Sequence, residues 1–252
     1  MAISIKSARE IELMREAGRI LSEVHEKLGE EIRPGISTWD INALGEELIR
    51  SYGCVPNFLN YNGYPASICV SVNHEVVHGI PNKSRILQEG DIVSLDAGLI
   101  YKGYHSDAAR THPVGRISRD AAKLIEATRR SFFAGIRYAR EGYRLFDISN
   151  AIDAYISRFG YGIVRDLVGH GIGTRLHEDP QIPNFRQWRR GPRLRPGMTL
   201  AIEPMINMGT WRVSWLDDDW TVVTQDGRLS AHYENTVLIT AGEPEILTLG
   251  SK

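Results

Sequence analysis

The strongest constraint on how this chain folds is that its second half repeats the sequence pattern of its first. A gapless shift of 107 positions superposes glycines, aspartates and aliphatic residues of the two halves. Because common residues rarely match this often over one long shift, we interpret the pattern as an internal duplication. Each repeat is then half of a domain, and we expect a single domain over residues 1–252 with halves at about 7–113 and 114–250. The matched pairs are Gly35 with Gly142, Asp40 with Asp147, Ile41 with Ile148, Ile49 with Ile156, Gly53 with Gly160, Leu87 with Leu194 and Gly90 with Gly197.

Each half opens with the pattern of two helices. Apolar residues recur at helical spacing, and Ser7 with Glu10 forms a capping box at the first helix start. Thr38 and Ser118 are predicted to cap the second and third helices. The four predicted helices span 7–31, 38–53, 118–142 and 147–160.

Strand-like segments fill the rest of each half. The step Asp226–Gly227 is a hairpin signal, and we expect it to join the strand at 220–224 to the strand that enters Glu234. The order of elements predicts an α+β fold in which two helix pairs cover one curved, largely antiparallel sheet. The predicted strands span 66–72, 91–96, 200–203, 220–224 and 233–240.

Composition excludes several classes of protein. With 42% hydrophobic residues and a net charge of −1, the chain can bury a core and carries no overall charge that would attract nucleic acid or an anionic membrane. Its two cysteines, Cys54 and Cys69, are too few for a disulfide framework. No apolar run is long enough for a signal peptide or a membrane span. We therefore expect a cytoplasmic protein with neither a membrane nor a specific nucleic-acid partner.

Acidic residues stand at the ends of apolar strands in both halves. Asp96 ends one such strand and Asp107 follows it across Gly98 and Gly103, so if this stretch is a hairpin, in which both glycines permit the chain to reverse, the two carboxylates can meet across it. In the second half, Glu203 ends a strand and Glu234 returns after a longer hairpin. The shift of 107 positions also superposes Asp96 on Glu203. Four carboxylates in one interior repel each other and lose hydration, so they need cations between them. The pattern therefore predicts a metal site.

His170 completes this candidate ligand set, because the glycines around it allow its ring to approach the acids. One imidazole with four carboxylates suits Mn, Fe(II) or Co(II) better than structural zinc. Two ions that share bridging carboxylates would activate a water for attack on a carbonyl, which is hydrolysis.

With their flanking motifs, these five residues resemble the type I methionine aminopeptidases over nearly the whole chain. The motifs are NHEVVHGIP at 73–81, GHGIG at 169–173 and RPGM at 195–198. The resemblance implies the pseudo-two-fold pita-bread fold and a single catalytic domain. It also implies a metal-dependent hydrolase that removes the initiator methionine from nascent chains when the second residue is small. The cofactors it implies are two divalent ions, which could be Co, Mn, Fe(II) or Zn.

The resemblance assigns roles to the five ligands. Asp107 and Glu234 would bridge both ions, Asp96 would bind one, and His170 and Glu203 would bind the other. Glu203 would also carry protons between the water and the leaving amine.

Two further histidines receive roles from the same resemblance. His78 would hydrogen-bond the amide beyond the scissile bond, and His177 would polarise the scissile carbonyl. We interpret the remaining histidines as ordinary core or surface residues: His25, His74, His105, His112 and His232.

The methionine pocket implied by the resemblance is aromatic and sulfur-lined. Leu176 departs from the family pattern, which usually has Phe before the second catalytic histidine, and we expect a looser pocket wall there. The other pocket positions are Phe58, Tyr61, Tyr64, Cys69 and Trp220.

Other functions stay open on the sequence alone. Xaa-Pro aminopeptidases and prolidases share the five ligands but carry a large N-terminal domain, whereas the first helix here begins near Ser7. A non-enzymatic binding protein on the same fold is a second alternative, although all five ligands are present.

Partners are less constrained by the sequence. The resemblance suggests a monovalent cation near Asn73, Glu75 and Ser230. The arginine-rich segment 186–195 is interpreted as a solvated loop, with contact to ribosomal RNA as the alternative. We expect a monomer that acts on nascent polypeptide N-termini.

Overall fold

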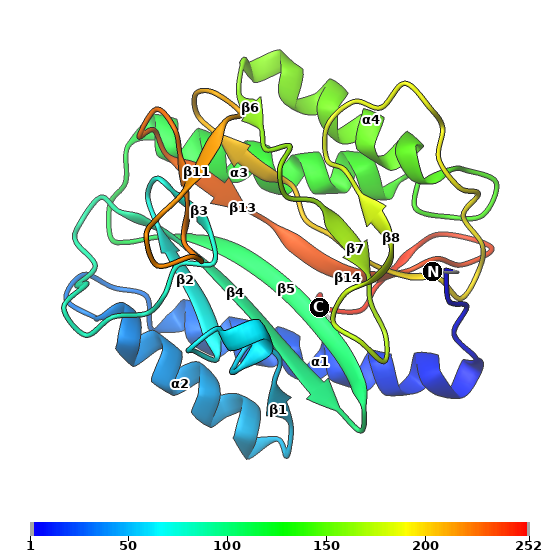
Figure 1. Cartoon of the computed structure of the whole chain (residues 1–252), viewed down its shortest axis with the longest axis horizontal. Coiled ribbons are helices and arrows are strands. Elements are labelled where there is room, and N and C mark those ends of the chain that lie inside the picture. The colour runs from blue at the N-terminus through cyan, green and yellow to red at the C-terminus, as the bar shows by residue number, and fades with distance from the viewer. Residues whose placement is uncertain (1–2, 251–252) are drawn as a thin grey trace.

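A computed structural model describes residues 3–250 of the chain (Figure 1). Its four long helices form the two expected pairs, one drawn below the strands and the other above them in the view of Figure 1. In the first pair, α1 packs against β4 (Ile92–Tyr101) and β5 (Tyr104–Pro113), and α2 packs against β2 (Ile68–Val72). In the second pair, α3 packs mainly against β13 (Ser230–His232) and β10 (Met205–Asn207). The helices are α1 (Ala8–Glu30), α2 (Thr38–Ser51), α3 (Arg119–Ile136) and α4 (Leu145–Ile156), with short 3-10 turns η1 (Tyr61–Gly63) and η2 (Ser157–Phe159).

The strands form one large antiparallel sheet and two small ones. The large sheet has the order β1-β4-β5-β14-β9-β7-β8, with β2 paired to β4 and β15 paired to β14. The small sheets are β13-β10-β6 and β11-β12-β3. The strands are β1 (Val55–Pro56), β2 (Ile68–Val72), β3 (Glu75–Val77), β4 (Ile92–Tyr101), β5 (Tyr104–Pro113), β6 (Gly162–Ile163), β7 (Gly169–Gly171), β8 (Glu178–Ile182), β9 (Thr199–Ile202), β10 (Met205–Asn207), β11 (Val213–Trp215), β12 (Val222–Thr224), β13 (Ser230–His232), β14 (Glu234–Leu238) and β15 (Glu245–Ile246).

The two halves meet at the centre of the large sheet, where β5 pairs with β14. On either side of this pair, β4 and β9 occupy equivalent positions in the strand order. Glycines related by the shift of 107 positions share one backbone conformation: φ is 92° at Gly35 and 91° at Gly142, and 96° at Gly90 and 89° at Gly197. Matched turns thus hold matched strands in place.

The helix caps agree with the sequence in part. Ser7 and Glu10 form the expected capping box. The cap of α2 is Ser37 rather than Thr38, because the Ser37 side chain accepts a hydrogen bond from the backbone of Asp40. Helix α3 ends at Ile136, earlier than expected, and residues 137–142 form turns instead.

The prediction of a hairpin at Asp226–Gly227 is wrong, because the two flanking strands do not pair with each other. The chain does turn there, with Gly227 at φ 70° and its N–H donating to the carbonyl of Thr224. The flanking strands then diverge, because β12 pairs with β11 and β3 whereas β13 pairs with β10. Long-range partners therefore decide where these two strands lie.

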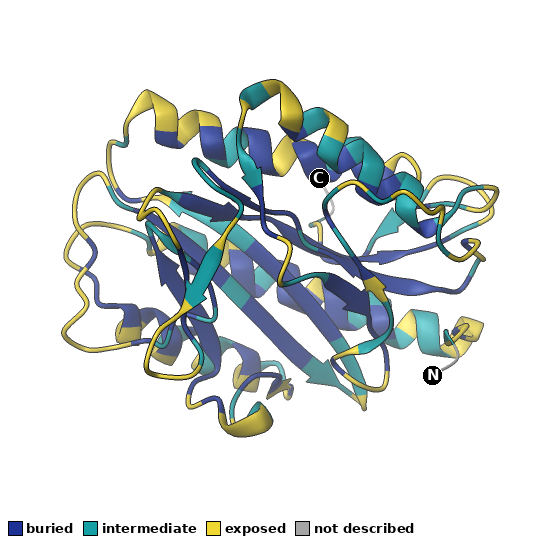
Figure 2. Ribbon diagram, turned by 45° about the horizontal axis from the view of Figure 1, so that its top comes forward, coloured by how far each residue is buried: buried dark blue, intermediate teal, exposed yellow. Residues whose placement is uncertain are grey.

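The core lies between the helices and the large sheet (Figure 2). One apolar cluster joins α1 and α2 to strands of the first half, and another joins α3 and α4 to strands of the second. None of the helices within residues 3–250 combines the length and apolar character needed to cross a membrane.

Gly98 provides a direct test of how tightly this sheet is packed around its acids. A methyl group at Gly98 would lie 2.3 Å from Nδ2 of Asn57 and 2.9 Å from Oδ1 of Asp107. Gly98→Ala should therefore lower the free energy of unfolding by about 1–3 kcal/mol through overpacking. Urea unfolding measures this loss, with Gly242→Ala as the control, since its nearest neighbour would be 4.0 Å away. Equal stability of the two variants would contradict the tight packing.

Candidate active site

Two of the acids face each other across the β4–β5 hairpin. Its turn lies at Lys102 and Gly103, and its register pairs Gly98 with Asp107. Asp96 lies two positions along β4 from Gly98, so the two aspartates are diagonal neighbours on one face of the sheet. Gly103 reverses the chain as expected, whereas Gly98 lies within the strand and leaves space for the Asp107 carboxylate.

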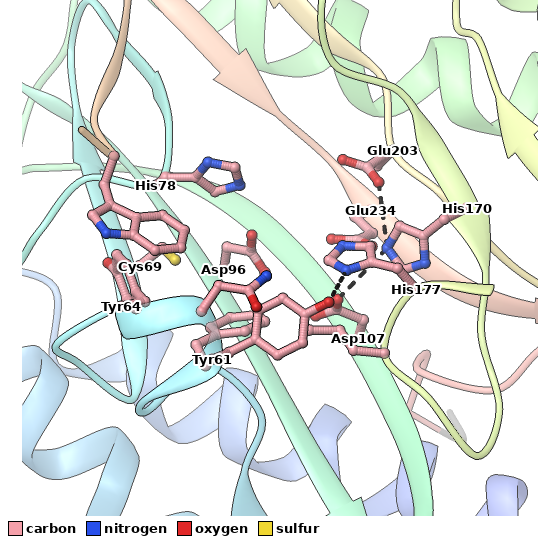
Figure 3. Close-up of a pocket in the computed structure, with 14 residues that line it drawn as sticks. Tyr61, Tyr64, Cys69, His78, Asp96, Asp107, His170, His177, Glu203 and Glu234 are labelled. Atoms are coloured by element: carbon pink, nitrogen blue, oxygen red, sulfur yellow. Dashed lines mark hydrogen bonds and ion pairs between the residues drawn. The ribbon is translucent and has the colours of Figure 1, made fainter. Parts of the chain in front are cut away.

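The two glutamates reach the same face from the other half. Glu234 begins β14 and pairs with Ala109 of β5. Glu203 directly follows β9, whose Ile202 pairs with Asn235 of β14, so the glutamates are neighbours across these strands. All four carboxylates therefore converge at the centre of the sheet (Figure 3).

His170 brings a nitrogen to this cluster. Its Nε2 lies 3.9 Å from Oδ2 of Asp107 and 3.7 Å from Oε1 of Glu203. Its Nδ1 donates to the carbonyl of Gly171 at 2.9 Å, which leaves the lone pair of the neutral ring on Nε2, toward the acids. Gly169 permits this approach, because a methyl group there would lie 2.4 Å from the carbonyl oxygen of Ala201.

The electrostatics of this cluster favour a cation. Burial raises the pKa of Asp96 to about 7, and burial with mutual repulsion raises the pKa of Asp107 and Glu234 well above the usual range. Burial also raises the pKa of Glu203, whereas it lowers the pKa of His170 to about 3. The imidazole is thus neutral and ready to bind a metal, while the carboxyl groups resist ionisation without one.

The donor set fits divalent metal ions. Ligand atoms of Asp107, His170 and Glu234 all lie within 4.8 Å of one another. Among residues 3–250, Oδ1 of Asp96, Oδ1 of Asp107 and Oε1 of Glu234 are buried without a hydrogen-bond partner. Oxygen-rich clusters with one imidazole are typical sites for Mn, Fe or Co.

A cavity of about 230 Å³ opens beside the acids. All eight side chains that the sequence assigns to substrate binding line it, and Asn62 lines it as well although the sequence does not single it out. The eight are Phe58, Tyr61, Tyr64, Cys69, His78, Leu176, His177 and Trp220.

The far side of this cavity is apolar. Phe58, Tyr64, Cys69 and Leu176 pack in one cluster of buried side chains. The rings of Tyr64 and Trp220 meet edge to face at 5.1 Å. Burial raises the pKa of the Cys69 thiol well above its usual value, so this wall carries no charge.

Besides His170, two histidines line the cavity, and they are held differently. His78 follows β3 in a left-handed conformation with φ 59°, and burial lowers its pKa to about 4. The His177 ring shares a hydrogen bond of 2.7 Å between its Nδ1 and the hydroxyl of Tyr61 (Figure 3). Burial lowers the pKa of His177 as well, so both rings are predominantly neutral at pH 7.

The loop that carries His177 is anchored by the segment before α1. Glu178 accepts a hydrogen bond from the Lys6 ammonium at 2.6 Å, and both side chains are buried. The Lys6 backbone N–H also donates to the carbonyl of Gly197 at 2.8 Å.

His232 is the histidine that the sequence misjudges. It is buried, and its Nε2 lies 3.6 Å from Oε2 of Glu203 and 4.0 Å from Oε2 of Glu234. Its position two residues before Glu234 is the signal in the sequence, because alternate residues of an extended chain point to one side. The other histidines interpreted as ordinary do not line the cavity: His25, His74, His105 and His112.

Comparison with known proteins agrees with this geometry. The sequence pattern of metallopeptidase family M24 matches residues 12–241. The methionine aminopeptidase of Clostridium acetobutylicum is 55% identical over 98% of this chain and 99% of its own length. The chain belongs to the methionine aminopeptidases of family M24. Its fold is the pita-bread fold that the repeat and the resemblance predict, because a crystal structure of methionine aminopeptidase from Thermotoga maritima superposes with a TM-score of 0.96 at 44% identity, covering 98% of this chain and 100% of the other.

The prolidase alternative is not favoured. An Xaa-Pro dipeptidase from Bacillus anthracis shares the fold, with a TM-score of 0.80, but is 26% identical and is matched over 62% of its length, against 98% of this chain. A non-enzymatic binding protein is not favoured either, because the full-length relatives are named as enzymes and the five predicted ligands converge.

The raised carboxyl pKa values predict how metal binding depends on pH. An ion binds the ionised carboxylates, so at pH 7 its binding should displace protons from the acids, whereas His170 is already neutral and contributes none. Affinity should rise between pH 6 and 8, by up to about tenfold per pH unit for each proton released.

Calorimetric titration with Mn(II) or Co(II), in buffers of different ionisation enthalpy, measures this proton release. Glu203→Gln keeps the side-chain shape but cannot ionise, and it should release fewer protons than the parent protein. Binding at pH 7 that releases no protons would contradict the raised pKa values.

Proposed function

We propose that this chain hydrolyses the bond after the initiator methionine of nascent proteins and peptides whose second residue is small. The observation that carries the proposal is the direct adjacency of a five-ligand acid and histidine cluster to an apolar cavity lined by Cys69 and aromatic rings. Membership of the family supports hydrolysis as the reaction. The apolar, sulfur-containing lining of the cavity supports methionine as the residue that is removed.

The residues that would hold the metal ions are those of the cluster. Asp107 and Glu234 would bridge two divalent ions, Asp96 would bind one of them, and His170 and Glu203 would bind the other. When bound, the ions supply Lewis-acid activation of water and of the scissile carbonyl, together with a site for the free amine. The buried carboxylate oxygens without hydrogen-bond partners support this assignment.

The cavity would select methionine through its apolar wall. A thioether packs well against aromatic rings and sulfur, which the rings of Tyr64 and Trp220 and the neutral Cys69 thiol provide. Leu176 belongs to this wall and is 3% exposed. Because Leu lacks the aromatic face of the usual Phe, we expect weaker discrimination between methionine and other unbranched side chains.

Three side chains would assist the reaction. Glu203 would pass a proton from the water to the leaving amine. His78 would bind the amide beyond the scissile bond, and its neutral ring supplies one donor for it. His177 would stabilise the developing oxyanion through Nε2–H.

Tyr61 would fix the tautomer of His177 that this role requires. A tyrosine hydroxyl that donates to Nδ1 leaves the proton of the neutral ring on Nε2. The hydrogen bond of 2.7 Å between these two side chains supports this assignment.

Partners and location extend the same proposal. The substrates would be the N-termini of nascent chains in the cytoplasm. The enzyme would act as a monomer, with one catalytic domain over residues 1–252. Asn73 and Ser230 are joined by a backbone hydrogen bond of 2.8 Å, which brings together two segments of the proposed monovalent cation site. The arginine-rich segment 186–195 is mostly exposed, which suits a solvated loop and, in the alternative interpretation, would let it contact ribosomal RNA.

A panel of Met-Xaa-Gly-Gly peptides tests the function. Cleavage should be rapid when Xaa is Gly, Ala, Ser, Cys, Thr, Val or Pro, and slower by roughly 100-fold for Leu, Phe, Lys or Arg, because a small cavity beside the metal ligands leaves little room for the second side chain. An N-acetylated Met-Ala-Gly-Gly peptide and a chelator are the controls, and both should abolish release of methionine. Comparable kcat/KM for Ala and Leu peptides would exclude the narrow site, and fast release of other first residues would exclude the function.

Tyr61→Phe tests the tautomer assignment. The change keeps the ring in the cavity wall but removes the hydroxyl, so kcat for Met-Ala-Gly-Gly should fall about five- to tenfold, with KM and bound metal nearly unchanged. Tyr104→Phe is the control, since its hydroxyl bonds Glu10 outside the cavity. An unchanged kcat in Tyr61→Phe would show that the hydroxyl does not direct His177.

A further inference from the structure

His232 is a buried side chain of the metal-site region that the ligand set does not use. It is 1% exposed, and neither of its ring nitrogens has a hydrogen-bond partner among residues 3–250. Its side chain is not among those that line the cavity. A neutral imidazole ring has one nitrogen that donates a hydrogen bond and one that accepts.

The backbone holds His232 firmly in place. Its N–H donates to Oγ1 of Thr111 at 2.9 Å, and the same hydroxyl donates back to the His232 carbonyl at 2.9 Å. On its other side, His232 pairs with Met205 of β10. The chain segments 203–205 and 232–234 thus run side by side, and their pairing directs the His232 ring toward Glu203.

Glu203 has one imidazole beside each of its carboxylate oxygens. Its Oε1 lies 3.7 Å from Nε2 of His170, and its Oε2 lies 3.6 Å from Nε2 of His232. If Oε1 binds the ion that His170 binds, as the proposed function requires, then Oε2 faces His232 and needs a donor. A movement of about 0.5 Å would bring this nitrogen and oxygen into hydrogen-bond distance.

The tautomer of His232 follows from the same contacts. With Nε2 near Oε2 of both Glu203 and Glu234, a lone pair on this nitrogen would face two carboxylates. A proton on Nε2 turns this repulsion into a charge-assisted hydrogen bond, so Nε2 is the favoured donor. The lone pair then lies on Nδ1.

We propose that His232 is a positioning residue that donates from Nε2 to Oε2 of Glu203 and fixes the orientation of this carboxylate. Glu203 then presents Oε1 to the metal side with little loss of rotamer freedom on binding. Residues that orient a metal ligand in this way typically contribute 10- to 100-fold to metal affinity or activity. The inference rests on the proposed function for the role of Glu203.

Two substitutions of His232 separate positioning from the alternatives. His232→Gln retains an amide donor that can reach Glu203, whereas His232→Leu removes every polar atom. Co(II) titration by calorimetry should show affinity 10- to 100-fold weaker in His232→Leu and within about threefold of the parent protein in His232→Gln. The kcat for Met-Ala-Gly-Gly should follow the same order, with KM within about twofold.

The control is His112→Leu, which removes another histidine with an unpartnered ring nitrogen outside the site. It should match the parent protein in Co(II) affinity and kcat, and thermal melting checks that every variant is folded. If His232→Leu does not fold, His232→Ala, which also removes both ring nitrogens, takes its place and should show the same 10- to 100-fold loss of Co(II) affinity.

Two results would overturn the inference. Parental Co(II) affinity in His232→Leu would exclude positioning. A changed visible absorption spectrum of the Co(II) protein in His232→Gln, or the loss of one bound ion, would make His232 a ligand instead. The metal measurements do not depend on peptide hydrolysis, so they decide the role of His232 even if the parent protein releases no methionine, a result that would reject the proposed function separately.

Discussion

Repulsion among four buried carboxyl groups is the constraint around which this structure is organised. Asp107 and Glu234 are 4% and 2% exposed, so water can neither hydrate these carboxyl groups nor screen the repulsion between them. Their backbones belong to the central pair of strands, β5 and β14, which is fixed by the rest of the large sheet. The fold thus holds these acids together against their mutual repulsion, and cations are the natural compensation for this cost.

The two halves share one backbone framework, but not all of the residues that form the site are repeated in both halves. The matched glycines and the equivalent places of β4 and β9 give both halves the same framework. His170 has no ring counterpart in the first half: it pairs with Ala201 of β9, whereas the matched residue of β4, Ser94, pairs with Ser71. The cavity is also one-sided, because most of its lining residues other than the five predicted ligands lie within residues 58–78. A duplicated framework therefore carries a single, asymmetric site.

Local signals explain what the sequence predicts and what it does not. The Ser7 capping box and the β4–β5 hairpin depend on residues close in the chain, and both appear where expected. The step Asp226–Gly227 has an equally strong local signal, yet its strands are drawn apart by β3 and β10, partners that no short window contains. For His232, the local signal is its place two residues before Glu234, whereas its contact with Glu203 joins distant segments and is visible only in the structure.

The buried ion pair of Lys6 and Glu178 couples the position of the segment before α1 to that of the loop that carries His177. Glu178 directly follows His177, and Lys6 is tied through its backbone to Gly197, so the segment spans two loops of the second half. Breaking such a pair leaves one buried charge uncompensated, which is costly. A fusion partner that pulls on this segment would therefore strain the loop around His177, although the two lie far apart in sequence.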